Sequence, residues 1–433
     1  MTGRFALVNA SAVICGPAEG GPVRHPTWDH LGVKNGVGVG VENGRIAMIA
    51  PDGELREWTR EVIDCDGRLV TAGLVDAHTH AVFGRARLGD QARRARGEDY
   101  KAIAAAGGGI LSSVADFRGR TEDDLVALTT NRLRQLAALG STTIEVKSGY
   151  GLTLDHELKA LRVVRRAQET LPVTLVPTFL GAHEVPEEYR ARRDAYVRLV
   201  IEAMIPAVAS QKLARFCDIF CEPGVFGLAE SEAILTAAQR AGMLVKLHAD
   251  ELDNIGAAEL AARLGATSAD HLGGISAKGV DALAGSETVA VLLPGTLVFL
   301  GKTRQAPARV LVESGAILAL ATDFNPGSSP TGNLPLIMAL GVSQQRLQPE
   351  EAFIAATVNA ACALGEGSTR GRLVPGGSAD LVVWNCRDVR ELCYWYGMPL
   401  VWRVYAAGHP CHGGEVGISS AGSGAEPLSP RIS

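Results

Sequence analysis

Eight short apolar runs, separated by longer helical stretches, are the feature that most constrains the fold. Runs of this kind are typical of parallel strands that are buried on both faces and covered by helices. Eight strand–helix units predict an α/β fold, a (β/α)8 TIM barrel. The runs cover residues 69–75, 142–146, 173–179, 216–220, 243–247, 266–269, 288–293 and 316–321.

The chain on either side of these units has a different pattern. Short strand-like pieces cut by Gly, Pro and Asn precede the first unit, and similar pieces return after Gly371. At 433 residues, the chain exceeds the ~250–300 residues at which a single core stops growing. We therefore predict a barrel over 70–370 and a small β-sandwich domain formed by both termini, 1–69 and 371–433. The Ser/Gly/Pro-rich tail, about 414–433, is expected to be disordered.

Composition and charge exclude several classes of protein. No apolar run reaches the ~18–20 residues that cross a bilayer, because Pro294 and Gly295 interrupt the longest candidate. The net charge of −5 gives nucleic-acid binding little electrostatic support. The N-terminus is more typical of a first strand than of a signal peptide, and none of the eight cysteines forms a Cys-x-x-Cys pair. We expect a cytoplasmic protein with reduced thiols, and neither a membrane nor a nucleic acid as a partner.

Side chains suited to metal binding follow the predicted strands. His78 and His80 follow the first run, and alternate residues of an extended chain face the same way, so both imidazoles can bind one ion. Because TIM-barrel active sites lie at the C-terminal ends of the strands, we predict a metal centre there. The later runs lead into His183, His248 with Glu251, Asp270 with His271, and Asp323.

The residue types at these strand ends indicate a hydrolase. Three neutral imidazoles and one carboxylate suit a single divalent transition metal and leave a position for water. An ion held in this way lowers the pKa of water toward ~7, so the predicted reaction class is metal-assisted hydrolysis. Glu251, three residues after His248, is a candidate proton carrier, and His271 is a second.

Two other groups of potential ligands are interpreted as structural. Cys217 and Cys221 lie on a strand-like segment, where alternation turns both thiols toward one packed face. Lys147 lies on the second predicted strand, and we expect it to form a salt bridge with Glu145 rather than to bridge two metal ions. The sequence therefore predicts one metal ion.

Beyond these general features, particular stretches of sequence carry a family resemblance. They are GLVDAHTHAVFG (73–84), GGGI (107–110), EVKSGYGL (145–152), FLGAHEVP (179–186), LHADE (247–251), SADHL (268–272), LLPGT (292–296) and ATDFNPGSSPTGN (321–333). Over about residues 40–410, the chain resembles the amidohydrolase superfamily and, within it, the imidazolonepropionase family. EVKSGYGL, GAHEVP and DFNPGSSP favour that family over its deaminase relatives.

The resemblance implies a reaction and a set of site residues. The implied substrate is 4-imidazolone-5-propanoate, whose ring is opened by water to N-formimidoyl-L-glutamate in histidine degradation. The implied cofactor is one zinc or iron ion, and the implied assembly is a homodimer. The metal ligands then fall on His78, His80, His248 and Asp323, and the substrate-binding positions on Arg87, Tyr150, His183, Glu251, Asn325, Gly327 and Ser328.

The roles implied for these residues agree with their chemistry. Arg87 offers a planar fork of donors to the propanoate carboxylate, and Arg85 is the alternative for this role. Tyr150 and His183 can hydrogen-bond the polar atoms of the ring, and His183 is expected to polarise the carbonyl under attack.

Two questions stay open at the level of sequence. The first is which of Glu251, His271 and Asp323 is the principal base. The second is the exact class of protein. A guanine- or cytosine-type deaminase also carries Glu three residues after a His ligand, and ammonia release would distinguish it. A non-catalytic scaffold with this fold tends to lose ligands, whereas all four remain here.

Overall fold

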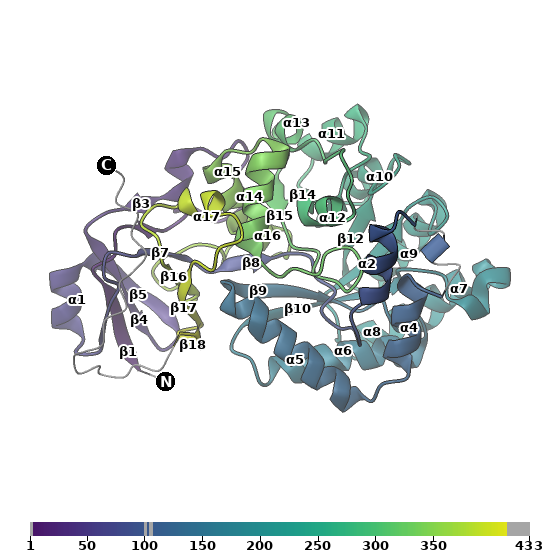
Figure 1. Ribbon diagram of the computed structural model, residues 1–433, viewed down its shortest axis with the longest axis horizontal. Coiled ribbons are helices and arrows are strands. Elements are labelled where there is room, and N and C mark those ends of the chain that lie inside the picture. The colour runs from purple at the N-terminus through teal and green to yellow at the C-terminus, as the bar shows by residue number, and fades with distance from the viewer. Residues whose placement is uncertain (1–2, 99–101, 104–106, 414–433) are drawn as a thin grey trace.

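The chain folds into a parallel barrel with a β-sandwich beside it (Figure 1). The structure, a computed structural model, describes residues 3–98, 102–103 and 107–413. The tail predicted to be disordered, about 414–433, lies outside the described residues. Within the described part of the chain, no helix is both long enough and apolar enough to cross a membrane.

Eight parallel strands form the barrel in the order of the sequence. The sheet closes beyond its first and last strands, where the Asp323 N–H donates to the His78 carbonyl at 3.0 Å and the His80 N–H donates to the Phe324 carbonyl at 2.9 Å. This closed sheet confirms the predicted TIM barrel. Its strands are β8 (Leu74–Asp76), β9 (Ser141–Lys147), β10 (Thr174–Ala182), β11 (Phe216–Cys221), β12 (Leu244–Ala249), β13 (Ser268–His271), β14 (Val289–Leu292) and β15 (Leu318–Leu320).

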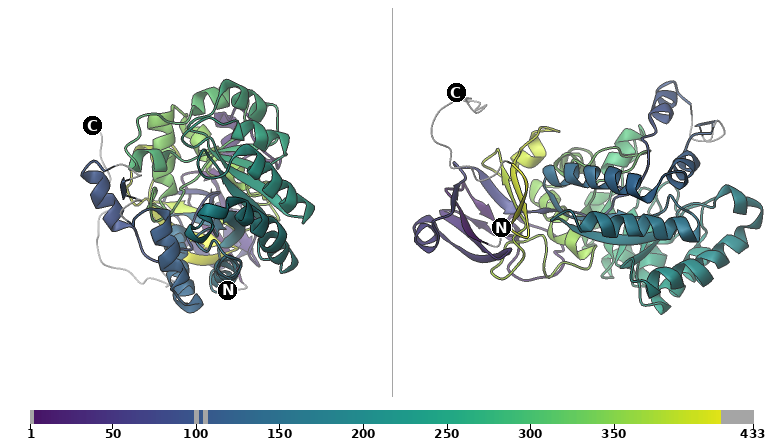
Figure 2. Two further views of the ribbon diagram at one scale, coloured as in Figure 1. Left: turned by 90° about the vertical axis from the view of Figure 1, so that its right-hand side faces the viewer. Right: turned by 90° about the horizontal axis from the view of Figure 1, so that it is seen from below.

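Helices cover the outside of the barrel (Figure 2, left). Local sequence sets their ends; α5, for example, begins after Thr121, whose hydroxyl accepts the Asp124 N–H at 3.1 Å. The helices are α2 (Leu88–Ala95), α4 (Ile110–Arg118), α5 (Glu122–Ala138), α6 (Leu154–Gln168), α7 (Arg193–Leu199), α8 (Ile205–Ser210), α9 (Leu228–Arg240), α10 (Ala257–Arg263), α11 (Ala277–Ala284), α12 (Pro294–Phe299), α13 (Ala308–Glu313), α14 (Leu334–Gln345), α15 (Pro349–Ala355) and α16 (Val358–Cys362). A 3₁₀ turn, η2 (Glu187–Arg192), precedes α7, and a π-helical turn, η3 (Val200–Met204), follows it.

The sequence run 69–75, predicted to be the first barrel strand, serves two different sheets. Its first half, β7 (Leu69–Ala72), belongs to the sandwich, and only β8 belongs to the barrel. At the joint, the Gly73 N–H donates to the Asp380 carbonyl at 2.9 Å. Both halves are fully buried. Hydrophobicity alone therefore cannot show the residue at which the chain passes from one sheet to the other.

Strands from both ends of the chain form the β-sandwich, seen as the purple and yellow segments of Figure 1. One sheet has the order β5-β4-β1-β6 and the other β18-β17-β16-β7-β2-β3. The bounds are β1 (Arg4–Val8), β2 (Val13–Ile14), β3 (Val33–Lys34), β4 (Val37–Glu42), β5 (Arg45–Pro51), β6 (Val62–Asp64), β16 (Leu381–Trp384), β17 (Val401–Ala406) and β18 (His409–His412), with short helices η1 (Trp28–Leu31), α1 (Asp52–Trp58) and α17 (Glu391–Tyr394). The predicted small sandwich is confirmed, and the exact domain limits stay a prediction.

Alternation along β11 separates an apolar face from a polar one. Cys217, Ile219 and Cys221 are buried in the apolar core around the strands, and both cysteines are free thiols, which agrees with the packing role predicted for them. Asp218 is also fully buried, but its carboxylate contacts Lys147 inside the barrel. One strand therefore supplies packing outside the barrel and charge inside it.

Trp384 joins the sandwich to the barrel. It lies on sandwich strand β16, is fully buried, and belongs to the same apolar core as Leu74 of the barrel. Its indole N–H donates to the Thr71 hydroxyl at 2.9 Å.

We expect Trp384→Ala to lower the free energy of unfolding by about 3–5 kcal/mol, because it opens a large cavity between the two parts. Thermal unfolding followed by circular dichroism measures this effect. Trp395→Ala is the control, because that side chain is 37% exposed, and it should change the midpoint little. An unchanged midpoint for Trp384→Ala would contradict the joining role.

Candidate active site

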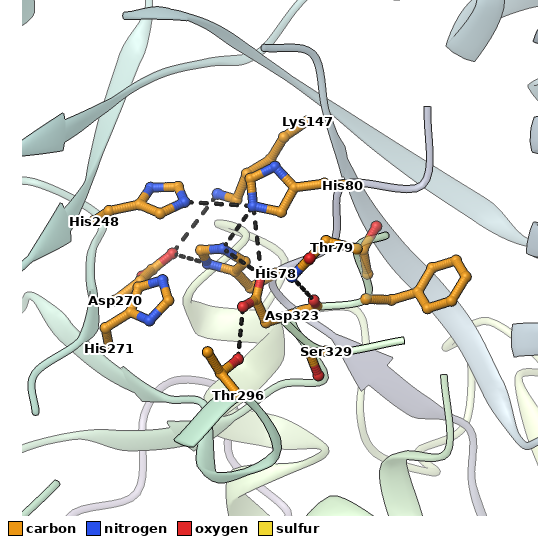
Figure 3. A network of polar contacts seen from close by, with 12 residues as sticks. His78, Thr79, His80, Lys147, His248, Asp270, His271, Thr296, Asp323 and Ser329 are labelled. Atoms are coloured by element: carbon orange, nitrogen blue, oxygen red, sulfur yellow. Dashed lines mark hydrogen bonds and ion pairs between the residues drawn. The ribbon is translucent and has the colours of Figure 1, made fainter. Parts of the chain in front are cut away.

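Four of the predicted ligands converge at the C-terminal ends of the barrel strands (Figure 3). The Nε2 atoms of His78 and His80 lie 3.2 Å apart, and those of His80 and His248 lie 3.4 Å apart. Asp323 Oδ1 lies 3.5 Å from Nε2 of His78 and 3.5 Å from Nε2 of His80. Each of these residues is at most 3% exposed. The structure thus brings together the four donors that the sequence suggested.

The donor set fits a single divalent cation. The His78 Nδ1 lies 2.6 Å from Asp270 Oδ2, and the His248 Nδ1 lies 3.1 Å from Asp218 Oδ2. A carboxylate can only accept, so the His78 Nδ1 carries the proton and its Nε2 presents a lone pair, and the His248 Nδ1 faces the Asp218 carboxylate at ion-pair distance. Lone pairs that face one another repel unless a cation lies between them. Four tetrahedral donors at ~2.0–2.1 Å from zinc lie roughly 3.4 Å apart, which is close to the separations observed.

A set of fully buried charged residues lies beneath these donors: Glu145, Lys147, Asp218, Lys246 and Asp270, here called the buried charge cluster. Lys147 Nζ lies 2.9 Å from Glu145 Oε2, so the predicted salt bridge is confirmed. Sequence reasoning missed the parts played by Asp218 and Lys246. A signal for both was present, because each is a charged residue within a strand that is otherwise apolar.

Glu251 and His271 lie beside the donors, with Glu251 Oε2 3.6 Å from His271 Nε2. Burial, followed by the charge of Asp323, raises the pKa of Glu251 to about 8. A carboxyl group with this pKa carries a proton at neutral pH. Glu222, which the sequence did not indicate, holds the loop by accepting the N–H groups of Glu251 at 3.0 Å and Asp253 at 2.9 Å.

His183 lies against the predicted ligand His80, with ring centroids 5.1 Å apart and an interplanar angle of 19°. Its Nδ1 lies 3.0 Å from the Gly149 carbonyl, so this nitrogen carries the proton. Burial, followed by the charge of His248, lowers the pKa of His183 to about 3, which keeps the ring neutral. The Nε2 is therefore a hydrogen-bond acceptor. The ring of Tyr150, which is buried, lies 5.6 Å from that of the partly buried His183.

One buried carboxylate fixes the loop that carries Tyr150. Glu157, at the start of α6, accepts the N–H groups of Gly149 at 3.1 Å, Gly151 at 2.8 Å and Leu152 at 2.8 Å. A Cβ at Gly151 would lie 2.5 Å from the backbone of the same helix, so glycine is required for this close approach. Sequence reasoning missed Glu157, because nothing in its motif distinguishes it from a surface acid.

Of the two arginines considered for the propanoate, only Arg87 lies at the site. Its side chain is 14% exposed and lies against Gly327, where a Cβ would fall 1.1 Å from Arg87 Nη2. Glycine at 327 is therefore needed to admit the guanidinium. The Arg85 side chain is 72% exposed and lies 3.8 Å from Asp116.

The side chain of Asn325 forms hydrogen bonds that fix the loop after the predicted ligand Asp323. Its Oδ1 accepts the N–H groups of Gly327 at 2.7 Å and Ser328 at 2.8 Å, and its Nδ2 donates to the Asp323 carbonyl at 2.7 Å. These bonds use the Asn325 amide within its own loop. The loop brings Gly327 and Ser328 to the same side of the barrel as Arg87.

Comparison with solved structures supports the fold. A triazine hydrolase variant superposes with a TM-score of 0.75 at 16% identity and covers 94% of each chain. Escherichia coli guanine deaminase gives a TM-score of 0.72 at 15% identity, covering 96% of this chain and all of its own. A zinc-containing adenosine deaminase from Xanthomonas campestris gives 0.67 at 19%, covering 94% of this chain and 92% of its own. Likeness at these identities concerns the fold alone.

Comparison of sequences shows the family. A model described as the amidohydrolase family matches residues 84–392. The imidazolonepropionase of Bacillus velezensis is 44% identical over 391 residues, covering 90% of this chain and 93% of the relative. That of Solibacter usitatus is 43% identical over 406 residues, covering 93% and 97%. The chain therefore belongs to the amidohydrolase family and, within it, to the imidazolonepropionases.

Proposed function

We propose that the chain hydrolyses 4-imidazolone-5-propanoate to N-formimidoyl-L-glutamate, a step of histidine degradation. Water adds to the ring carbonyl carbon, and the bond from that carbon to the adjacent ring nitrogen breaks, which leaves a new carboxylate. The observation that carries this proposal is the identity of 42–44% over about 90% of the chain to relatives named imidazolonepropionase.

We assign one zinc or iron ion to His78, His80, His248 and Asp323. This assignment is supported by the 3.2–3.5 Å separations of their donor atoms and by the hydrogen bond between the His78 Nδ1 and Asp270. Such an ion, when bound, lowers the pKa of water toward ~7 and polarises the ring carbonyl.

Arg87 is the group that we assign to the propanoate carboxylate. Its guanidinium is largely buried beside Gly327, so a bidentate bond formed there is shielded from water. The loop at Gly327 and Ser328 adds polar groups at the same end. Each arginine has an acidic neighbour at 3.8 Å, so the smaller exposure of Arg87 is what favours it for this role.

His183 and Tyr150 are assigned to the ring. The proton on the His183 Nδ1 faces the Gly149 carbonyl, so its Nε2 accepts a hydrogen bond from a ring N–H. This geometry favours recognition of a ring N–H over the polarisation of the carbonyl that the family resemblance implied, because polarisation requires a proton on Nε2.

Proton transfer is assigned to Glu251, with His271 and Asp323 beside it. Glu251 has the raised pKa that suits a group which takes and returns a proton near neutrality. His271 lies within 3.6 Å of it, and Asp323 Oδ2 is held by the Thr296 hydroxyl at 2.6 Å. We therefore place Glu251 as the principal proton carrier that protonates the leaving ring nitrogen.

We propose that the protein forms a homodimer in the cytoplasm, that it acts on a small molecule, and that it binds no nucleic acid. We also propose the domain limits 1–69 with 371–433 for the sandwich and 70–370 for the catalytic barrel.

The purified protein should consume freshly generated 4-imidazolone-5-propanoate, seen as loss of its ultraviolet absorbance, with N-formimidoyl-L-glutamate as product. Chelation should abolish the activity, and zinc or iron should restore it. Guanine and cytosine serve as controls. Ammonia released from either base, without turnover of the imidazolone, would instead favour a deaminase.

Glu251→Gln should lower kcat by roughly 10²-fold or more, because a positioned acid–base group contributes on this order. The amide keeps the size of the side chain but cannot transfer the proton. Metal analysis of the variant is the control and should give full content. Activity within a few-fold of the unmodified enzyme would remove Glu251 from the mechanism.

Arg87→Ala should raise KM about 10–100-fold and change kcat less, because a charged hydrogen bond to a non-reacting carboxylate is worth ~1.5–3 kcal/mol. Arg85→Ala is the matched control, since it removes the same charge two residues away and should leave KM within about twofold. Steady-state kinetics on both variants decide the assignment. The reverse result would give the propanoate to Arg85.

A further inference from the structure

The buried charge cluster lies directly beneath the proposed metal ligands, and the mechanism above does not use its lysines. Both lysines and all three acids of the cluster are 0% exposed. Burying an ion is costly unless the opposite charges are close and well bonded. Apolar side chains would fill the barrel interior without this cost, so we expect the buried charge cluster to have a role besides packing.

Lys147 is the cation that contacts both carboxylates behind the proposed ligands, and Figure 3 shows its amine directed toward Asp270. Its Nζ lies 2.7 Å from Asp218 Oδ2 and 3.7 Å from Asp270 Oδ2, in addition to the bond with Glu145 at 2.9 Å. Its side chain is 0% exposed. Lys147 therefore acts on the proposed ligands from beneath them, through the acids that it contacts and through its own charge.

The same two carboxylate oxygens hold two of the proposed ligands. Asp218 Oδ2 lies 3.1 Å from the His248 Nδ1, and Asp270 Oδ2 lies 2.6 Å from the His78 Nδ1. The other oxygen of each acid is also bonded, Asp218 Oδ1 to the Ile219 N–H at 2.7 Å and Asp270 Oδ1 to the Ser268 hydroxyl at 2.6 Å. Neither carboxylate can rotate without breaking several bonds.

Lys246 offers a close comparison. It is equally buried, and its Nζ lies 2.9 Å from Glu145 Oε1, the same separation that Lys147 has from the other oxygen of that acid. Its Nζ also lies 3.0 Å from the Ala77 carbonyl, 3.9 Å from Asp270 and 5.6 Å from the centroid of the Phe216 ring. Of the two lysines, Lys147 is the one that hydrogen-bonds Asp218.

We propose that Lys147 is a positioning residue for the metal centre. It fixes the Asp218 carboxylate through their hydrogen bond, and through that carboxylate it sets the orientation in which His248 presents Nε2 to the cation. The inference rests on the ligands assigned under the proposed function. Groups that orient metal-binding histidines commonly change metal affinity 10–100-fold when they are removed.

The test compares Lys147→Met with Lys246→Met in the full-length protein. Zinc affinity is measured by competition with a chromophoric chelator, and the visible spectrum of the cobalt-substituted protein reports ligand geometry. We expect zinc affinity to fall 10–100-fold and the cobalt spectrum to change in Lys147→Met, whereas Lys246→Met stays within about threefold. Thermal unfolding should show both variants destabilised, since both lose a buried ion pair.

Zinc affinity of Lys147→Met within threefold of the unmodified protein, or an equal loss in both variants, would overturn the proposal. If Lys147→Met does not fold, Lys147→Leu, which also removes the hydrogen-bond donor, is read by the same limits. In an Asp218→Asn background, either Lys147 substitution should cause little further loss, because Lys147 acts through Asp218.

The outcomes also separate this inference from the proposed function. Failure of the unmodified protein to bind zinc would remove the metal assignment itself. Zinc binding without turnover of the imidazolone would overturn the proposed reaction and leave the comparison of the two lysines valid.

Discussion

Closure of the barrel between its first and last strands is the constraint on which the site depends. The backbone bonds that close it join His78 to Asp323 and His80 to Phe324, so residues from opposite ends of the barrel sequence become direct neighbours. These two hydrogen bonds fix the backbone at three of the four proposed ligands, His78, His80 and Asp323. A break in this seam would separate donors that now lie 3.5 Å apart, and no side-chain adjustment could recover that separation.

The polar interior below the ligands is the second structural requirement. A barrel filled by apolar layers is the usual solution, but the histidines need acceptors behind them, and acceptors that are buried need cations. The structure provides both in successive layers. Asp270 and Asp218 lie behind the proposed ligands His78 and His248, and Lys147 lies behind these two acids. Stability and metal geometry are therefore coupled in the same set of side chains.

Sequence reasoning reached the barrel, the sandwich and the four convergent donors because each depends on local pattern or on position at a strand end. It placed Cys217 and Cys221 in the core by alternation, and the same rule would have placed Asp218 inside the barrel. The split of the run 69–75 between two sheets could not be predicted, since both halves are equally buried. Glu157 and Glu222 act on backbone N–H groups, which carry no sequence signal of their own.

Three loops around the site are held in the same way, by one side chain that accepts hydrogen bonds from several backbone N–H groups. Glu157 holds the loop of Tyr150, Glu222 holds that of Glu251, and Asn325 holds that of Ser328. Loops fixed in this way are ordered before substrate arrives, so little binding energy is spent on arranging them. Under the proposed roles, selection among ring substrates falls to these fixed groups, with Arg87 beside Gly327 binding the carboxylate and His183 accepting a ring N–H. Guanine and cytosine have no carboxylate for Arg87, so the proposed site would favour an imidazolone that carries a propanoate.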